Sequence, residues 1–170
     1  MPLKQLLLSI LQETYPGEDD YNAAPTQTLP VIRSRADGRL EYAPMRWWLT
    51  PSWSQGPSTQ YSMFNAKIET AAKSPAFKMP FAKQRCVMPV TGYYEWHRNA
   101  RRKQPFLISD QAQGGLLLAG LWDAWRPRGS AGDAAELLSF TLLTTAAHEA
   151  LRALHPRQPT LLTIEHAQPW

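Results

Sequence analysis

One carboxylate lies within an aromatic segment, residues 91–96, and is the first candidate for proton-transfer chemistry. The order Tyr93-Tyr94-Glu95-Trp96 predicts a β-strand in which Tyr93 and Glu95 share one face and Tyr94 and Trp96 the other. Aromatic neighbours would exclude water from Glu95. A carboxylic acid poised in this way can donate and recover protons, as general acid–base catalysis requires. The alternative is an ordinary strand carboxylate that faces water.

The tripeptide His155-Pro156-Arg157 combines an imidazole with a guanidinium. Residues 146–154 have helical composition, and Pro156 disfavours a helical conformation at the residue before it, so His155 is predicted at the C-terminal end of a helix. Imidazole exchanges protons near neutral pH, and a guanidinium can bind a phosphate through two parallel hydrogen bonds. Alternatively, His155 is a surface histidine without a catalytic role.

Asn65 and Lys67 stand at the start of a run with helical composition, residues 67–82, which Pro75 interrupts. Asn65 can therefore be interpreted as the N-cap of this helix, with Glu69 completing its first turn. On these residues alone, capping is the favoured interpretation.

Aromatic and basic side chains gather around a predicted polar loop, residues 50–60. Trp47, Trp48 and Trp53 follow closely after Arg46, and such a mixture suits the stacking of unpaired bases beside bound phosphates. Most tryptophans of a small domain fill its core. Trp53, which lies in the loop, is the predicted exception.

Hydrophobic patterning predicts the elements that position these residues. Leu3–Leu11 has the spacing of an amphipathic helix that faces a core, and Asp37-Gly38 between two apolar runs indicates a β-hairpin. Further strands are expected at residues 85–89, 92–97, 105–109, 116–125 and 137–144, with a flexible connection at 126–135. Short polar turns between strands favour antiparallel pairing, and the chain is predicted to form one α+β domain.

Composition limits the classes of function. The net charge of +4 is compatible with a polyanionic partner without requiring one. One cysteine among 170 residues excludes an internal disulfide and a cysteine-rich zinc site, and we expect neither a metal nor a cofactor. Polar residues interrupt the apolar stretch near the start, so we expect neither a signal peptide nor a membrane span. A monomer in the cytoplasm, associated with the nucleoid if bacterial, is expected.

Short motifs occur in the order found in the SOS-response-associated peptidase family, which the chain resembles from about Tyr21 to its last residue. These motifs are Tyr21-Asn22-Ala23-Ala24-Pro25, Met45-Arg46-Trp47, Pro51-Ser52-Trp53, Asn65-Ala66-Lys67 with Glu69-Thr70, Arg85-Cys86, Gly92-Tyr93-Tyr94-Glu95-Trp96 and His155-Pro156-Arg157. Each motif is weak alone, and the ordered set is specific.

The resemblance implies a mixed, largely antiparallel curved sheet or open barrel with flanking helices that binds single-stranded DNA at an abasic site. It implies that Glu95 promotes opening of the sugar ring, that His155 assists, and that Asn65 orients the nucleophile. The DNA-binding residues implied in this way, or by the aromatic and basic pattern, are Lys67, Arg157, Trp53, Arg46 and Thr144.

Family members act in the DNA damage response and begin Met-Cys-Gly-Arg. Their N-terminal cysteine, exposed by self-processing, closes a thiazolidine with the abasic aldehyde. This chain begins Met1-Pro2-Leu3-Lys4, and its single thiol, Cys86, is expected to be packed and inert. The family usually continues beyond the position of Trp170. Residues 1–170 are therefore expected to be one family domain that is incomplete at both ends.

Three readings stay open. The first is an abasic-site enzyme whose authentic start is not represented, the second a non-catalytic single-stranded DNA binder, and the third an α+β domain with no role on DNA. A further hypothesis concerns Pro2, whose amine would be exposed by removal of Met1. Such an amine can attack an aldehyde, but without a thiol the adduct would be labile.

Overall fold

The computed structural model describes residues 3–97, 104–129, 136–167 and 170. The amine of Pro2 and residues 130–135 of the expected flexible connection lie outside the described residues. The strands are β1 (Thr28–Ser34), β2 (Leu40–Trp47), β3 (Asn65–Lys67), β4 (Arg85–Val90), β5 (Tyr93–Trp96), β6 (Pro105–Ile108), β7 (Leu116–Trp125), β8 (Leu137–Ala146), β9 (Arg157–Pro159) and β10 (Leu161–Leu162). The helices are α1 (Leu3–Leu11), α2 (Ile68–Ala71), α3 (Lys78–Lys83), the 3-10 helix η1 (Glu149–Leu151) and α4 (Ile164–Ala167).

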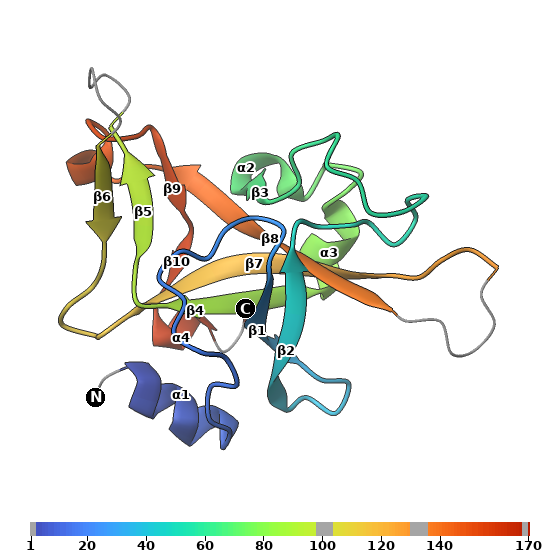
Figure 1. The fold of residues 1–170 in the computed structure, drawn as a ribbon, viewed down its shortest axis with the longest axis horizontal. Coiled ribbons are helices and arrows are strands. Elements are labelled where there is room, and N and C mark those ends of the chain that lie inside the picture. Colours follow the sequence, from blue (N-terminus) through green and yellow to red (C-terminus); the bar gives the residue numbers. More distant parts are fainter. Residues whose placement is uncertain (1–2, 98–103, 130–135, 168–169) are drawn as a thin grey trace.

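Strands β7, β4, β1, β2 and β8 form a closed ring, because β8 pairs with β2 on one side and with β7 on the other. The pairs within the ring are antiparallel except β2–β8, which is parallel. Beyond the ring, β3 and β9 extend from the two edges of β8, and β10 pairs with β7. The predicted mixed, mostly antiparallel and curved α+β architecture is confirmed (Figure 1).

The predicted hairpin and N-terminal helix are both present. In β1–β2, Thr28 pairs with Arg46 and Ser34 with Leu40, and the turn uses Gly38 at φ +82°, a conformation that glycine adopts without steric cost. Helix α1 occupies the predicted residues. Leu3 and Leu11 pack outside the sheet, in a cluster with the outward side chains of β1, β4 and β7.

The interior of the ring is filled by side chains that alternate along its strands. This cluster comprises Leu29, Val31, Ala43, Met45, Cys86, Met88, Leu118, Phe140 and Leu142. Phe140 is fully buried and stacks on Trp47, with ring centroids 6.2 Å apart. Period-two alternation places one set inside and leaves the other for the helices.

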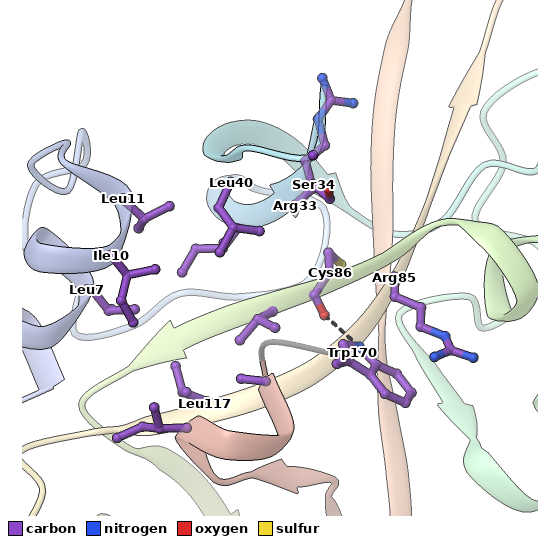
Figure 2. A pocket seen from close by; sticks show the side chains of 15 residues that line it. Leu7, Ile10, Leu11, Arg33, Ser34, Leu40, Arg85, Cys86, Leu117 and Trp170 are labelled. Carbon is purple, nitrogen blue, oxygen red and sulfur yellow. Dashed lines mark hydrogen bonds between the residues drawn. The ribbon is translucent and has the colours of Figure 1, made fainter. Parts of the chain in front are cut away.

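A cavity of about 310 Å³ lies outside the ring, between α1, the β1–β2 hairpin, α4 and Trp170. Leu7, Ile10 and Leu11 point toward Leu40 across it (Figure 2). Trp170 covers one end, and its indole N–H donates to the carbonyl of Cys86 at 3.2 Å. Glu95 and His155 do not line this cavity.

The predicted helix over residues 146–154 is wrong. Strand β8 continues to Ala146, and only the single 3-10 turn η1 follows it, with the imidazole of His148 accepting a hydrogen bond from the N–H of Ala150. Pairing with β9 competes successfully with helix formation, since Ala146 pairs with Arg157 and the N–H of Ala147 donates to the carbonyl of Pro156. His155 therefore does not lie at the end of an α-helix.

The interpretation of Asn65 as a helix N-cap is also wrong. Asn65 begins β3 and pairs with Leu142 of β8. The N-cap position of α2 belongs to Lys67, which makes no side-chain capping hydrogen bond. Strand β3 continues through Lys67, which pairs with Thr144 of β8, so α2 begins only at Ile68 and the sheet determines where the helix begins.

Candidate functional site

Glu95 and His155 meet beside the barrel. Glu95 lies on β5, which pairs with β6 in a separate two-stranded ribbon at the left of Figure 1. Its Oε2 is 3.6 Å from Nδ1 of His155, and the two side chains are only 21% and 23% exposed. The other carboxylate oxygen accepts a hydrogen bond from the N–H of Trp96 at 3.0 Å, which fixes the carboxylate with Oε2 toward the imidazole.

The predicted alternation along β5 is confirmed. Tyr93 and Glu95 are half-buried, whereas Tyr94 and Trp96 are 45% and 48% exposed. The hydroxyl of Tyr93 is buried and has no hydrogen-bond partner among the described residues. Burial, with a smaller contribution from the charge of Glu95, raises the pKa of Tyr93. The phenol is thus a neutral neighbour of the carboxylate.

His155 Nδ1 faces both polar groups of the Arg157 main chain. It lies 2.8 Å from the carbonyl oxygen of Arg157 and 3.1 Å from the nitrogen, whose N–H can donate to it. A protonated Nδ1 would donate to the carbonyl and leave Nε2 as an acceptor, whereas an unprotonated Nδ1 would accept from the N–H and leave Nε2 as a donor. The same backbone therefore satisfies either neutral tautomer.

The guanidinium of Arg157 is held inside the protein rather than free. It forms two parallel hydrogen bonds with Glu69 of α2, at 2.7 and 2.9 Å, and Nη2 also donates to Thr144. The hydrogen bonds and charge of Arg157 lower the pKa of Glu69 to about 2. The predicted DNA-binding residues Thr144 and Arg157 are in contact, and Arg157 is already paired with a carboxylate.

Asn65 and Lys67 occupy exposed positions on β3, with the buried Ala66 between them. Lys67 pairs in register with Thr144 of β8, so β3, β8 and β9 lie side by side at this end of the barrel. Asn65 and Lys67 share one face of β3. Five of the predicted site residues (Glu95, His155, Arg157, Thr144 and Lys67) are thus connected through contacts or strand pairing.

Arg46 and Trp53 lie toward the other end of β8. Arg46 pairs with Ser139, five residues before Thr144, a separation of roughly 17 Å along a strand. Nη1 of Arg46 is buried without a hydrogen-bond partner in the described part of the chain. Trp53 is 59% exposed, as predicted, in the loop that follows β2 and lies on the right of Figure 1.

Buried polar side chains that sequence reasoning missed anchor the Trp53 loop. The carboxylate of Asp123, only 5% exposed, accepts the N–H of Ser52 at 2.8 Å, and the hydroxyl of Ser139 accepts the N–H of Thr50 at 2.8 Å. The indole of Trp125 donates to the carbonyl of Ser54. One signal was available: Asp123 is a lone charge within the apolar strand sequence Leu116–Trp125. The same loop region also exposes Tyr61 by 66%, which sequence reasoning did not single out.

Comparison with known proteins identifies the family of the chain. Residues 4–170 match the family described as SOS response associated peptidase (SRAP). The chain belongs to this family. The resemblance carried by the ordered motifs is thereby confirmed, over a longer part of the chain than the motifs themselves cover.

Several relatives of this SRAP chain are named abasic site processing proteins. The chain is 32% identical to YoaM of Bacillus subtilis over 155 residues, and this alignment covers 90% of this chain and 66% of YoaM. It is 33% identical over 150 residues to YedK of Escherichia coli, covering 88% and 63% of the two chains, and 31% identical over 184 aligned positions to HMCES of Pongo abelii, covering 86% and 51%. The chain spans about half to two thirds of the length of these relatives.

Solved structures share the SRAP chain's fold. A Bordetella bronchiseptica protein superimposes with a TM-score of 0.82 at 22% identity, covering 100% of this chain and 84% of the other. A Bacteroides thetaiotaomicron protein gives a TM-score of 0.74 at 26% identity, covering 85% and 62%. The barrel and its attached strands are therefore an arrangement found in experimentally determined structures.

Three further observations bear on the chemistry of this SRAP chain. In the part of the chain that the structure describes, no group of three or more His, Cys, Asp or Glu side chains could hold a metal ion. No described helix combines the length and apolar character that crossing a membrane requires.

Cys86, the single cysteine of the 170 residues, is 2% exposed in the barrel interior, and burial raises the pKa of its thiol.

We expect Cys86 to be unreactive in the folded protein. Only the thiolate is nucleophilic, so a reagent that alkylates accessible thiols should react slowly with the native protein. In the time needed to modify all of the protein unfolded in guanidinium, it should modify less than about one tenth of the native protein. Mass spectrometry of the two samples measures this difference. Rapid, complete labelling of the native protein would contradict the buried placement.

Proposed function

We propose that this SRAP-family chain recognises abasic sites in single-stranded DNA and that Glu95 and His155 exchange protons with the abasic sugar. The observation that carries the proposal is the 3.6 Å approach of the side chains of Glu95 and His155, in a chain whose relatives are named for abasic-site processing. The pair is partly shielded from water, since the two side chains are 21% and 23% exposed.

The chemistry proposed for the pair is opening of the abasic sugar ring. Opening a cyclic hemiacetal removes the proton of its anomeric hydroxyl, breaks the bond between that carbon and the ring oxygen, and delivers a proton to the ring oxygen. Glu95 would supply the proton to the ring oxygen, and His155 would accept the hydroxyl proton in the tautomer that leaves Nε2 free. Asn65, on β3, would orient the attacking group.

The DNA path proposed runs along β8, from the Trp53 loop to β3. Trp53 offers an exposed ring for base stacking, Lys67 a cation for a phosphate, and Arg46 a half-buried cation at the loop end of the path. Arg157 and Thr144 lie at the other end. Since the charge of Arg157 is already shared with Glu69, we propose that it contributes less to phosphate binding than Lys67 does.

Removal of Lys67 tests this path. A lysine that neutralises one phosphate releases about one counterion, so Lys67→Ala should reduce the slope of log affinity against log salt concentration by about 1. Arg157→Gln should reduce it by less. Fluorescence anisotropy of a labelled single strand at several salt concentrations gives the slopes, with Lys4→Ala on α1 as the control of equal charge. An unchanged slope for Lys67→Ala would place this residue off the DNA.

A second candidate function is a single-stranded DNA binder without covalent chemistry. The burial of Cys86 favours it, because these 170 residues provide no other thiol that could close a thiazolidine with an aldehyde. Thiazolidine crosslinking and self-processing are accordingly proposed only for a form of the protein that carries an N-terminal cysteine. For residues 1–170 we propose a single, monomeric domain that acts on damaged DNA in the cytoplasm.

The two candidates differ in how they treat an abasic strand. Purified protein is incubated with two single strands that differ only in one abasic position, with and without borohydride. The proposed function predicts tighter binding of the abasic strand and a borohydride-trapped product of its ring-opened aldehyde, including any iminium formed by Pro2. Equal affinity for both strands without a product supports the second candidate, and undetectable binding of either at low salt rejects both.

A further inference from the structure

We propose that Glu69 is a positioning residue, which holds Arg157 and, through the Arg157 backbone, sets the imidazole of His155 opposite Glu95. The catalytic consequence of this proposal rests on the proposed function. The structural consequence, a change at His155 when Glu69 is altered, rests only on contacts within the protein.

The guanidinium of Arg157 makes most of its hydrogen bonds within the protein. Of its five N–H groups, one on Nη1 and one on Nη2 go to the carboxylate of Glu69, and the other on Nη2 goes to Thr144, whose carbonyl oxygen and hydroxyl both accept. Nε is buried and lacks a partner among the described residues. Most N–H groups of this guanidinium are therefore already bonded within the protein. This suits a structural role for Arg157 better than the binding of a phosphate.

The two elements that this guanidinium connects lie on opposite edges of β8. Glu69 is in the first turn of α2, which follows β3 directly, and β3 pairs with one edge of β8. Arg157 is in β9, which pairs with the other edge. The ion pair crosses the end of β8 at Thr144 and joins its two neighbours. Because β9 comprises only three residues, its own ladder holds Arg157 weakly, and the ion pair supplies a second restraint.

The main chain of Arg157 in turn contacts the imidazole of His155. Both main-chain polar groups of Arg157 lie within 3.1 Å of His155 Nδ1, and the same nitrogen is 3.6 Å from Glu95. A shift of the Arg157 backbone moves the donor and the acceptor of His155 together. The balance between the two tautomers of His155 thus depends on where Glu69 holds Arg157.

The ion pair between Glu69 and Arg157 persists at neutral pH. The pKa of Glu69 is lowered from 4.5 to about 2, chiefly by its hydrogen bonds from Arg157. A carboxyl group with a depressed pKa in the folded state contributes its full stabilisation above its ordinary pKa and loses it as the pH falls through the lowered value. The restraint on His155 should therefore be complete above about pH 4.5 and weaken only toward pH 2.

A competing reading is that Glu69 imitates a phosphate and masks Arg157 until DNA displaces it. In that case removal of the carboxylate would free a cation, strengthen DNA binding and steepen its salt dependence. If Glu69 instead positions Arg157, removal of its carboxylate should change the environment of the His155 imidazole and slow the reaction. The affinity for DNA should then change little. The two readings can thus be separated with one set of variants.

The experiment compares Glu69→Ala and Glu69→Gln with the wild-type protein by nitrogen-15 NMR of the histidine rings between pH 5 and 8. The control is Glu41→Gln, which removes a carboxylate from an ion pair of similar length, with Arg33 at 2.8 Å, on the β1–β2 hairpin. We expect the Nδ1 and Nε2 resonances of His155 to shift in both Glu69 variants and not in the control. If Glu69→Ala does not fold, Arg157→Lys provides the same test, because lysine keeps the charge and loses the fork.

The second readout is the conversion of an abasic single strand. Misplacement of a reacting group by about 1 Å can cost on the order of 100-fold, so we expect Glu69→Ala to slow conversion by about 10- to 100-fold with the half-saturating DNA concentration nearly unchanged. Glu69→Asp should restore part of the rate. If the wild-type protein converts no DNA, the proposed function fails and the NMR comparison still decides the positioning. The positioning role of Glu69 would be overturned by unchanged His155 resonances in the Glu69 variants. Tighter DNA binding by these variants with a steeper salt dependence would also overturn it.

Discussion

Glu95→Gln is expected to lower the rate at which an abasic single strand is converted to product by about 10²- to 10⁴-fold, the usual contribution of general acid–base catalysis. Glutamine keeps the shape of the side chain and can still accept the N–H of Trp96, a bond of 3.0 Å in the native protein. It cannot give up or recover a proton for the sugar. The affinity for the strand should therefore change by less than about threefold.

The measurement is a single-turnover time course on a labelled abasic strand, together with the affinity and the melting temperature of each variant. Glu13→Gln, an exposed carboxylate beyond the end of α1, is the matched control and should match the wild-type protein in all three. A Glu95→Gln protein that unfolds, or that no longer binds DNA, would show that Glu95 supports the ribbon rather than the reaction.

Phe140→Ala is expected to lower the free energy of unfolding by about 3–5 kcal/mol, the range for removal of a buried aromatic ring. Phe140 is fully buried within the ring of strands, and its ring stacks on Trp47 with planes 15° apart. Truncation leaves a cavity beside Trp47, whose indole N–H donates to the carbonyl of Phe64 at 2.9 Å. The loss should thus also loosen the segment that leads into β3.

Urea denaturation followed by circular dichroism gives the free energies. Phe106→Ala is the matched control, since it removes the same ring from a position that is 43% exposed on β6, and it should cost less than about 1 kcal/mol. For a domain of this size, a loss of 3 kcal/mol lowers the melting temperature by roughly 6–12 °C. Equal losses for the two variants would contradict the placement of Phe140 in the barrel core.

The ordered motifs were enough to predict the family, and local patterns were enough to predict most elements. The alternation of Tyr93 to Trp96, the leucine spacing of α1 and the Asp37-Gly38 turn were all predicted correctly. Each of these depends on residues within a few positions of one another, whose period or backbone preference decides the structure locally. The exposure of Trp53 was predicted for the same reason, from the composition of its own loop.

The two incorrect predictions concern segments whose partners are distant in the sequence. Asn65 has the character of a helix cap and residues 146–154 that of a helix, yet β8 and β9 provide backbone partners that outcompete both. Local propensities amount to fractions of a kcal/mol per residue, and a row of strand hydrogen bonds with buried side chains outweighs them. Such a competition cannot be evaluated until both strands are placed.

By itself, the sequence determined the family, the positions of the longer strands along the chain, and the residue types available for proton transfer at Glu95 and His155, but not the short strands β3, β9 and β10. The tertiary structure decided which of these residues meet. It closed the ring by pairing β8 with β2 and β7, set Glu95 3.6 Å from His155, and paired Glu69 with Arg157, 88 residues away. The reason is physical: an ion pair or a strand pairing depends on distance in space, and no periodicity along the chain encodes which distant partner a charged side chain will find.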